Sequence, residues 1–331
     1  MQLTTTVKTE SGGIKISHRS RILFIGSCFA TNIGTKLQER AFDIEINPFG
    51  VLYNPLSIAT ALERIADGSP FTEESPEIFE HNGLWHSILH HSDFSHQNRK
   101  EALRRMNNSL GNAHTKIDGY DIIFITLGTA YTYTRKSDNR IVGNCHKLPG
   151  NNFSRRLLEI DEITDKLGST ISHYMSINPK TKFIFTVSPI RHLRDGAHDN
   201  QKSKATLLLA VDRIIEHFPT NTSYFPAYEI MLDELRDYRF FADDMVHPST
   251  KAIEYIWGRF SECYFDKETD SINNRIEEIV RGLGHRPFNA GAATYREFLE
   301  NLQQKILSIR KEYPHINLEN ELTRCNTLLN R

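Results

Sequence analysis

The feature that most constrains the fold is a short apolar run that ends in a turn of small residues and leads directly into a helical pattern. Residues 22–25 are all apolar, which is typical of a strand buried on both faces of a parallel sheet. Gly26 and Ser27 follow, and residues 29–42 have the pattern of a helix. We therefore expect Ser27 at the carboxyl edge of a sheet, beside the positive end of a helix dipole and its unpaired backbone N–H groups.

The same succession of strand and helix recurs along most of the chain. Strands are expected at residues 22–25, 43–46, 120–127, 182–187 and 223–225. Helices are expected at residues 29–42, 55–66, 99–114, 153–176, 202–218, 229–235 and 249–265. Strands and helices that alternate over short links predict an α/β fold with a parallel sheet.

Three segments depart from this alternation. Residues 1–21 are polar and read as an extended or loose arm. Residues 71–97 carry one proline and several histidines, and we interpret them as an insertion over the catalytic edge. After Asp266 the chain is polar, with helical periodicity at residues 272–283, 294–313 and 318–329. The sequence thus predicts a domain over residues 1–265 and a helical C-terminal extension over residues 266–331.

Composition excludes several classes of protein. The 331 residues carry 40 basic and 41 acidic side chains, so electrostatics give no reason to expect nucleic-acid or membrane binding. The four cysteines are far apart and suggest no disulfide framework. No apolar run resembles a signal peptide core or a membrane span, and a cytoplasmic location is expected.

Chemistry is expected where the strands end, because parallel strands share one ligand-binding edge. Five segments fall at or near strand ends: residues 26–27, 47–54, 128–130, 188–192 and 243–247. In the last segment Asp244 and His247 are three residues apart, so the carboxylate can reach the imidazole within one turn. Such a carboxylate orients the histidine while its Nε2 takes a proton from a serine hydroxyl. Ser27 is the candidate nucleophile.

The segment Gly26-Ser27-Cys28-Phe29-Ala30 resembles the block that gives the GSCFA family its name, and that family belongs to the SGNH/GDSL hydrolase superfamily. Asp244 and His247 match the Asp-x-x-His block of the superfamily, and Gly26-Ser27 matches the start of its Gly-Asp-Ser block. Further family blocks are recognised at residues 47–50, 126–130, 144–147 and 188–192. The resemblance covers roughly residues 22–265.

This resemblance implies a flavodoxin-like, three-layer α/β/α sandwich and acyl-ester chemistry with no cofactor or metal. Ser27 would be the nucleophile, His247 the general base and Asp244 the residue that orients it. The backbone N–H of Ser27 would be one oxyanion donor, and Gly50 matches the second donor by position. The usual third donor is an asparagine in a Gly-x-Asn block, but here the block reads Gly128-Thr129-Ala130.

Several candidates could replace the missing donor or bind the substrate. Thr129, Asn54 or Asn144 can take the donor's place, and His146 lies in the same family block as Asn144. The absence of one donor would cost about 3 kcal/mol of transition-state stabilisation. Arg191 and His192 are either structural partners of carboxylates or an anchor for an anionic group of the substrate.

Plainer interpretations accompany the catalytic ones. Ser27 can simply cap a helix, and Cys28 can be the nucleophile in its place. Asp243 can orient His247 in place of Asp244. A metal site is conceivable among the insertion histidines, which are His86, His90, His91 and His96, but apart from Asp93 between them no carboxylate or cysteine pattern completes one.

The sequence therefore predicts a serine esterase or deacylase that acts on a small-molecule or carbohydrate acyl ester. An O-acyltransferase onto a sugar hydroxyl is the alternative, because the fold alone cannot choose the acceptor. A non-catalytic binding protein that retains the fold is the alternative of another class, and the incomplete oxyanion set is its basis.

Overall fold

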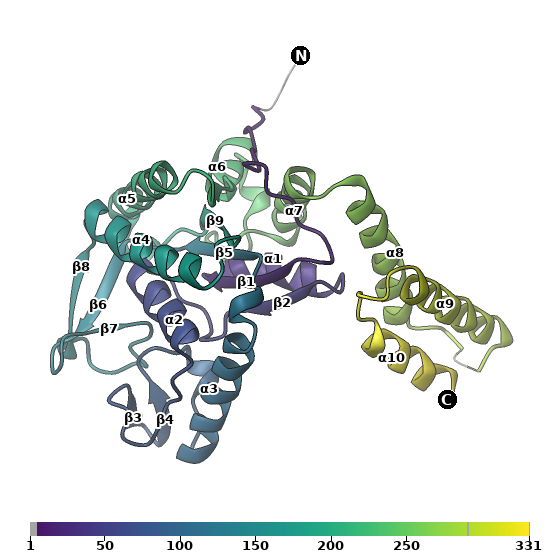
Figure 1. The fold of residues 1–331 in the computed structure, drawn as a ribbon, viewed down its shortest axis with the longest axis horizontal. Helices are drawn as coiled ribbons and strands as arrows, with labels where there is room; N and C mark the ends of the chain where they lie inside the picture. Colours follow the sequence, from purple (N-terminus) through teal and green to yellow (C-terminus); the bar gives the residue numbers. More distant parts are fainter. Residues whose placement is uncertain (1–4, 290, 331) are drawn as a thin grey trace.

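A five-stranded parallel sheet forms the centre of the computed structural model, which describes residues 5–289 and 291–330 (Figure 1). The strand order is β10-β9-β5-β1-β2, and all four neighbouring pairs are parallel. The strands are β1 (Arg21–Gly26), β2 (Asp43–Ile46), β5 (Ile122–Leu127), β9 (Lys182–Val187) and β10 (Thr222–Tyr224). β1 lies next to the middle of the sheet, so the segment that follows it is surrounded by other strand ends.

Each central strand contributes side chains to two separate cores, because successive residues of a strand point to opposite faces. Leu23 and Ile25 belong to one core, and Ile22 and Phe24 to the other. The first core is covered by α2 (Pro55–Asp67), α3 (Arg99–His114), α4 (Ile160–Ile177) and α5 (Gly196–His217). The second is covered by α1 (Cys28–Gln38), α6 (Ala227–Glu229), the π-helical turn Ile230–Glu234 and α7 (Thr250–Tyr264). The predicted α/β/α sandwich is confirmed.

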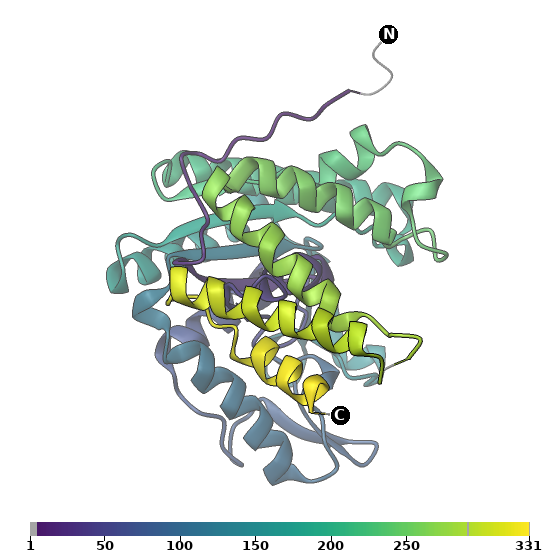
Figure 2. The same cartoon turned by 90° about the vertical axis from the view of Figure 1, so that its right-hand side faces the viewer.

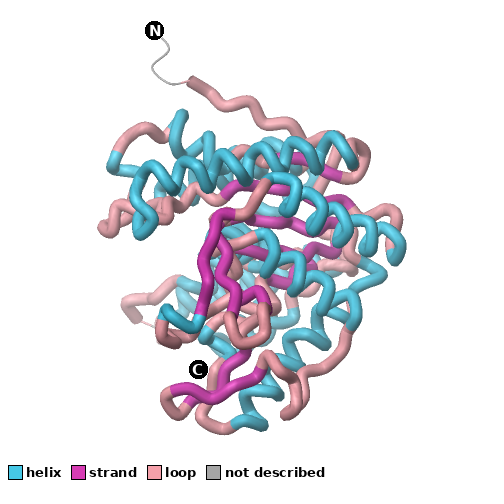
Figure 3. The backbone as a smooth tube through the Cα atoms, turned by 90° about the vertical axis from the view of Figure 1, so that its left-hand side faces the viewer, coloured by secondary structure: helices cyan, strands magenta, loops and turns pink. Residues whose placement is uncertain are grey.

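A second, antiparallel sheet was not predicted, and it corrects the helix expected over residues 153–176. It consists of β6 (Tyr131–Arg135), β7 (Arg140–Val142) and β8 (Phe153–Leu157) in the order β7-β6-β8. Figure 3 views the molecule from the side of this sheet. In β8 Phe153 is buried and the next three side chains are exposed, so no helical stripe begins before α4. The pairing of β8 with β6 decides the conformation of this segment.

Other element boundaries differ from the expectation by a few residues. α1 ends at Gln38 rather than at residue 42, and Ala41 beyond it has a left-handed backbone (φ 59°). α5 begins at Gly196, six residues before the predicted start. The short helix predicted at residues 229–235 is α6 followed by the π-helical turn.

The insertion predicted at residues 71–97 contains the antiparallel hairpin of β3 (Ile78–His81) and β4 (Leu84–Ser87). It lies against the segment that follows β2. The His90 ring stacks on Phe49 with ring centroids 4.3 Å apart, and the His91 N–H donates to the Phe49 carbonyl at 2.8 Å. The insertion thus contacts a loop at the carboxyl edge of the central sheet.

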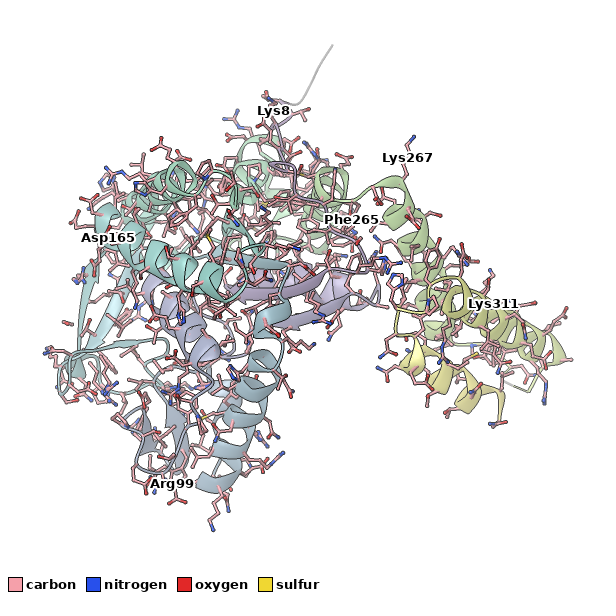
Figure 4. All side chains as sticks on the ribbon, in the orientation of Figure 1. Lys8, Arg99, Asp165, Phe265, Lys267 and Lys311 are labelled. Atoms are coloured by element: carbon pink, nitrogen blue, oxygen red, sulfur yellow. The ribbon has the colours of Figure 1, made fainter. Side chains whose placement is uncertain are left out.

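The last three helices, α8 (Lys267–Gly284), α9 (Ala293–Glu312) and α10 (Glu319–Leu329), form a third core of their own. They extend from the end of α7, as Figure 2 shows from that side, and Figure 4 labels Phe265 and Lys267 at the junction. Arg40 and Glu277 form an ion pair across the two parts at 2.8 Å. The boundary after residue 265 stays a prediction.

The arm predicted over residues 1–21 is partly outside the described residues, which begin at residue 5. From there to β1 the chain has no regular element, but Ile14 and Ile16 are buried in the second core. The Ile16 N–H donates to the Tyr264 carbonyl at 3.0 Å. This part of the arm is therefore packed rather than loose.

Candidate active site

Ser27 occupies the turn between β1 and α1, as the sequence predicts. Its hydroxyl accepts a hydrogen bond from the Phe29 N–H at 3.3 Å, so it caps α1. Its backbone N–H donates to the Thr126 carbonyl of β5 at 3.1 Å. The expectation of a free oxyanion donor at the Ser27 N–H is thus wrong for this structure. First-turn N–H groups of α1 such as that of Cys28 have no intrahelical acceptor and can take that role.

The turn before Ser27 depends on Gly26. Its φ is 134°, and a Cβ at this position would lie 2.1 Å from the Thr126 carbonyl oxygen. Its N–H donates to Asn47 Oδ1 at 2.8 Å, and Asn47 Nδ2 donates to Thr31 Oγ1 at 2.9 Å. Asn47 therefore fixes the end of β1 from the segment after β2.

Asp244 and His247 form a pair in the loop before α7. His247 Nδ1 and Asp244 Oδ2 are 2.6 Å apart. The other oxygen of Asp244 accepts the backbone N–H groups of Val246 and His247, both at 2.9 Å. These three hydrogen bonds lower the pKa of Asp244 to about 2, so the carboxylate is ionised near neutral pH. This arrangement leaves His247 Nε2 as the ring atom available to a substrate or a serine.

No hydrogen bond joins Ser27 to His247 within residues 5–289 and 291–330. Two other strand-end segments also place side chains at this edge, His192 after β9 and Tyr53 after β2. The His192 and Tyr53 rings are 5.6 Å apart, edge to face. Burial, followed by the positive charges of Lys204 and His247, lowers the pKa of His192 to about 4. His247 is therefore within electrostatic reach of His192, which lies in the segment after β9.

Lys204, on α5, is buried at the same edge of the sheet and was not predicted as a site residue. Its ammonium donates to the carbonyls of Gly128 and Ser188, both at 2.7 Å. These carbonyls directly follow β5 and β9. Burial lowers the pKa of Lys204 to about 7, and the Cys28 thiol acts in the opposite direction. Lys204 thus links two strand ends beside the start of α1.

The remaining predicted oxyanion donors already have partners. The Gly50 N–H donates to the Asn47 carbonyl at 2.7 Å. Asn54 caps α2, since its oxygen accepts from the Ser57 N–H and its amide donates to Ser57 Oγ, both at 2.9 Å. The N–H groups of Gly128 and Thr129 both donate to the Tyr53 carbonyl. The backbone N–H groups of Gly50, Gly128 and Thr129 would each have to break a hydrogen bond before serving an oxyanion, whereas the Asn54 amide has a second N–H donor.

Two predicted binding residues bind the insertion. Asn144 Nδ2 donates to Ser92 Oγ at 3.4 Å, and its oxygen accepts the His146 N–H at 2.8 Å. His146 Nε2 lies 2.7 Å from the Ser87 carbonyl. Arg191 is half-buried, and its Nε lacks a hydrogen-bond partner among the residues that the structure describes. Asn144 and His146 thus fasten the insertion, and the role of Arg191 as an anchor stays a prediction.

The family assignment follows from a comparison with protein-family models. The model of the GSCFA family matches residues 21–260, which is most of the chain. The chain belongs to the GSCFA family. The C-terminal domain of GSCFA domain proteins matches residues 276–331. No curated protein and no solved structure matches the chain.

In this GSCFA protein two insertion histidines, His86 and His90, are buried, and so is His146 of a neighbouring loop. Burial lowers the pKa of His90 to about 3 and that of His146 to about 4, which keeps both rings neutral. Over the described ranges, no three histidine, cysteine or carboxylate side chains gather as a metal site needs. The four cysteines are free thiols. None of the described helices is both long and apolar enough to span a bilayer.

Sequence reasoning missed Lys204 although a signal for it exists. The buried side chains Leu207, Val211 and Ile214 of α5 recur at helical spacing. Extending that stripe one turn toward the N-terminus reaches Ser203 and Lys204. A lysine on the buried stripe of a helix requires a partner in the interior, and this requirement marks it as a candidate.

Proposed function

We propose that this GSCFA protein is a serine esterase or deacylase of the SGNH/GDSL type, with Ser27, His247 and Asp244 as its triad. The observation that supports this most is the His247–Asp244 pair at 2.6 Å, in which the carboxylate is also held by two backbone N–H groups. An ionised, fixed carboxylate on Nδ1 makes Nε2 the proton acceptor and stabilises the imidazolium that forms. Ser27 supplies the hydroxyl at the end of β1.

The proposed reaction proceeds through an acyl-serine. His247 Nε2 takes the Ser27 proton as Oγ attacks the ester carbonyl, and the carbonyl oxygen becomes an oxyanion. First-turn N–H groups of α1, including that of Cys28, lie at the positive end of the helix dipole and stabilise this charge. The intermediate collapses, and the leaving alkoxide takes the proton from His247. An acceptor hydroxyl then releases the acyl group by the same steps in reverse.

A non-catalytic ligand-binding protein is the second candidate. Ser27 is only 1% exposed, its hydroxyl caps α1, and its N–H donates to the Thr126 carbonyl. In the catalytic proposal a substrate, or a small movement of the edge, has to bring Ser27 and His247 together. In the binding proposal the pair never acts on an ester.

Labelling with a fluorophosphonate probe separates the two candidates. The probe should modify wild-type protein at Ser27 near neutral pH, and Ser27→Ala should abolish the modification. Cys28→Ala is the matched control, because it changes the adjacent residue and should still be labelled. Wild-type protein that remains unlabelled, or Cys28→Ala that loses the label while Ser27→Ala keeps it, would contradict the assignment of Ser27.

The acyl acceptor is tested separately. The esterase proposal expects short acyl esters, including acylated sugars, to be hydrolysed at a rate that an added free sugar does not increase. If a sugar acceptor accelerates turnover and becomes acylated, the protein is an O-acyltransferase instead. Mass spectrometry of the sugar product distinguishes the two reactions, because only transfer adds the acyl mass.

A further inference from the structure

Lys204 is a buried charge at the candidate active site that the proposed triad does not use. Its side chain is among the largest fully buried ones of the described residues, with 1% of the residue exposed. Two carbonyl oxygens, those of Gly128 and Ser188, accept its hydrogen bonds at 2.7 Å. An ammonium group has three donors, so one remains after these two bonds are made. A buried lysine with a spare donor at the edge of the sheet calls for an explanation.

The contacts of α5 show how Lys204 is held in place. Asn200, Ser203 and Lys204 lie on one face of this helix, at helical spacing. Asn200 Oδ1 accepts the His192 N–H at 2.9 Å, and Ser203 Oγ accepts the Ala130 N–H at 2.8 Å. Besides Lys204, two neutral side chains of this face therefore bind the segments after β9 and β5. Fixing these segments does not in itself require a charge.

Lys204 lies close to the start of α1. Its ammonium binds the carbonyl of Gly128, two residues after Thr126, and Thr126 pairs with Gly26 and accepts the Ser27 N–H. The charge of Lys204 lowers the pKa of the Cys28 thiol, against the larger, opposite effect of burial. The Tyr228 ring also faces the ammonium, with 5.5 Å between Nζ and the ring centroid. An apolar side chain of similar length would fill the same space without the cost of desolvating a charge. A cation at this place is useful where negative charge forms, which in the proposed reaction is the oxyanion at Ser27.

We propose that Lys204 is a positioning residue that also gives the active site its positive charge, by joining the ends of β5 and β9 and stabilising anionic states at the start of α1. The proposal rests on the proposed function where it concerns an ester oxyanion. The ligand class that it implies is an ester whose reacting carbonyl becomes negatively charged beside Ser27 and Cys28. Because the lysine titrates near pH 7, its effect is largest where the ammonium is protonated.

The first test measures the effect of the Lys204 charge in an assay that does not depend on enzymatic activity. Cys28 is a built-in reporter, because an alkylating reagent reacts with its thiolate. Its rate of modification by iodoacetamide is measured by peptide mass spectrometry from about pH 6 to pH 9, relative to Cys145, a second partly exposed thiol of the same chain. Lys204→Met should lower this ratio about tenfold near pH 6, the change that one pKa unit produces.

Two matched variants separate charge from structure. Ser203→Ala removes the hydrogen bonds to Thr129 and Ala130 from the same face of α5 without changing the charge. Lys202→Met removes a charge from the exposed side of the same helix. Both should leave the Cys28 ratio within about twofold of the wild type. If Lys204→Met also leaves it unchanged, or if Ser203→Ala lowers it equally, the electrostatic role is refuted.

The second test concerns the reaction. With a short acyl ester, Lys204→Met should reduce kcat roughly a hundredfold and change KM far less, as for the loss of a group that acts in the transition state. A purely structural residue would be expected to change KM together with kcat. Wild-type protein without esterase activity would overturn the proposed function but leave the Cys28 result standing. If Lys204→Met does not fold, Lys204→Gln, which keeps an amide donor, replaces it in both tests.

Discussion

At the scale of single residues, Gly26 and Asn47 determine the shape of the turn that presents Ser27. Gly26 has a positive φ and no room for a side chain, and its N–H needs an acceptor in the interior. Asn47 supplies that acceptor, is 8% exposed and has a left-handed backbone of its own (φ 46°). Asparagine tolerates this conformation better than most residues. One side chain therefore satisfies two unusual backbone positions.

Replacing Asn47 should destabilise the protein strongly. Asn47→Ala leaves the buried Gly26 N–H without its acceptor and puts alanine at a left-handed position, so we expect a loss of about 2–4 kcal/mol. Asn47→Gly also removes the acceptor but tolerates the left-handed backbone, so its loss of unfolding free energy should be about 1 kcal/mol smaller than that of Asn47→Ala. The free energy of unfolding in urea measures both. Asn139→Ala is the control, since Asn139 has φ 57° but is exposed; an equal loss there would show that the bond to Gly26 contributes nothing.

At the scale of elements, the hairpin insertion is fastened to the sandwich by buried neutral histidines. His90 stacks on Phe49, and the His86 and His146 rings contact each other at a tilt of 37° with their centroids 4.4 Å apart. His90 Nδ1 lies 3.0 Å from Ser87 Oγ, whereas its Nε2 has no partner among the described residues. Protonated His90 would place an unpaired charge in this core, which is costly.

Stability should therefore fall in mild acid. The pKa of His90 is about 3 in the folded protein, against an ordinary value near 6.5 in the unfolded chain. Between these values the unfolded chain binds the proton and the folded one does not, so the free energy of unfolding decreases as the pH falls. The slope is at most about 1.4 kcal/mol per pH unit for each such histidine.

Urea unfolding of His90→Phe between about pH 6.5 and pH 4 tests this prediction. The slope of the unfolding free energy against pH should be smaller in the variant than in the wild type by about 1 kcal/mol per pH unit, because one histidine no longer titrates. His173→Gln, a change at an exposed histidine of α4, should keep that slope. A wild-type slope that persists unchanged in His90→Phe would exclude His90 as its source.

At the scale of the whole molecule, the chain consists of a sandwich with two cores and a helical extension with a third. The third core draws on α8, α9, α10 and the segment between α9 and α10. Its contacts with the sandwich include the Arg40–Glu277 pair and the side chain of Ala41. The candidate active site draws on β1, α1, α5 and the loop before α7, and none of its residues comes from the extension.

A chain truncated after Phe265 should accordingly keep the candidate site. We expect it to fold and to react with the fluorophosphonate probe at Ser27 within about threefold of the full-length rate, because separate cores can form independently. Circular dichroism and the labelling rate are the measurements. Arg40→Gln in the full-length chain controls for loss of the ion pair alone. A truncated chain that is folded but unreactive would show that the extension contributes to the site.

The sequence by itself determined the features that depend on neighbouring residues. The apolar run of β1, its ending at Gly26 and Ser27, and the Asp244–His247 pair are local, since each involves residues within one turn or strand. The parallel sheet followed from the alternation of strands and helices. Local spacing and periodicity suffice for such features, because side-chain direction within an element is fixed by its geometry.

Only the tertiary structure decided the features that depend on distant partners. Residues 153–157 form a strand because β6 pairs with them, and Lys204 is a site residue because Gly128 and Ser188 meet it in the interior. The same holds for the backbone N–H of Ser27, which donates to the carbonyl of Thr126 in β5. Hydrogen bonds between remote segments and the desolvation of a charge arise only when the chain is packed.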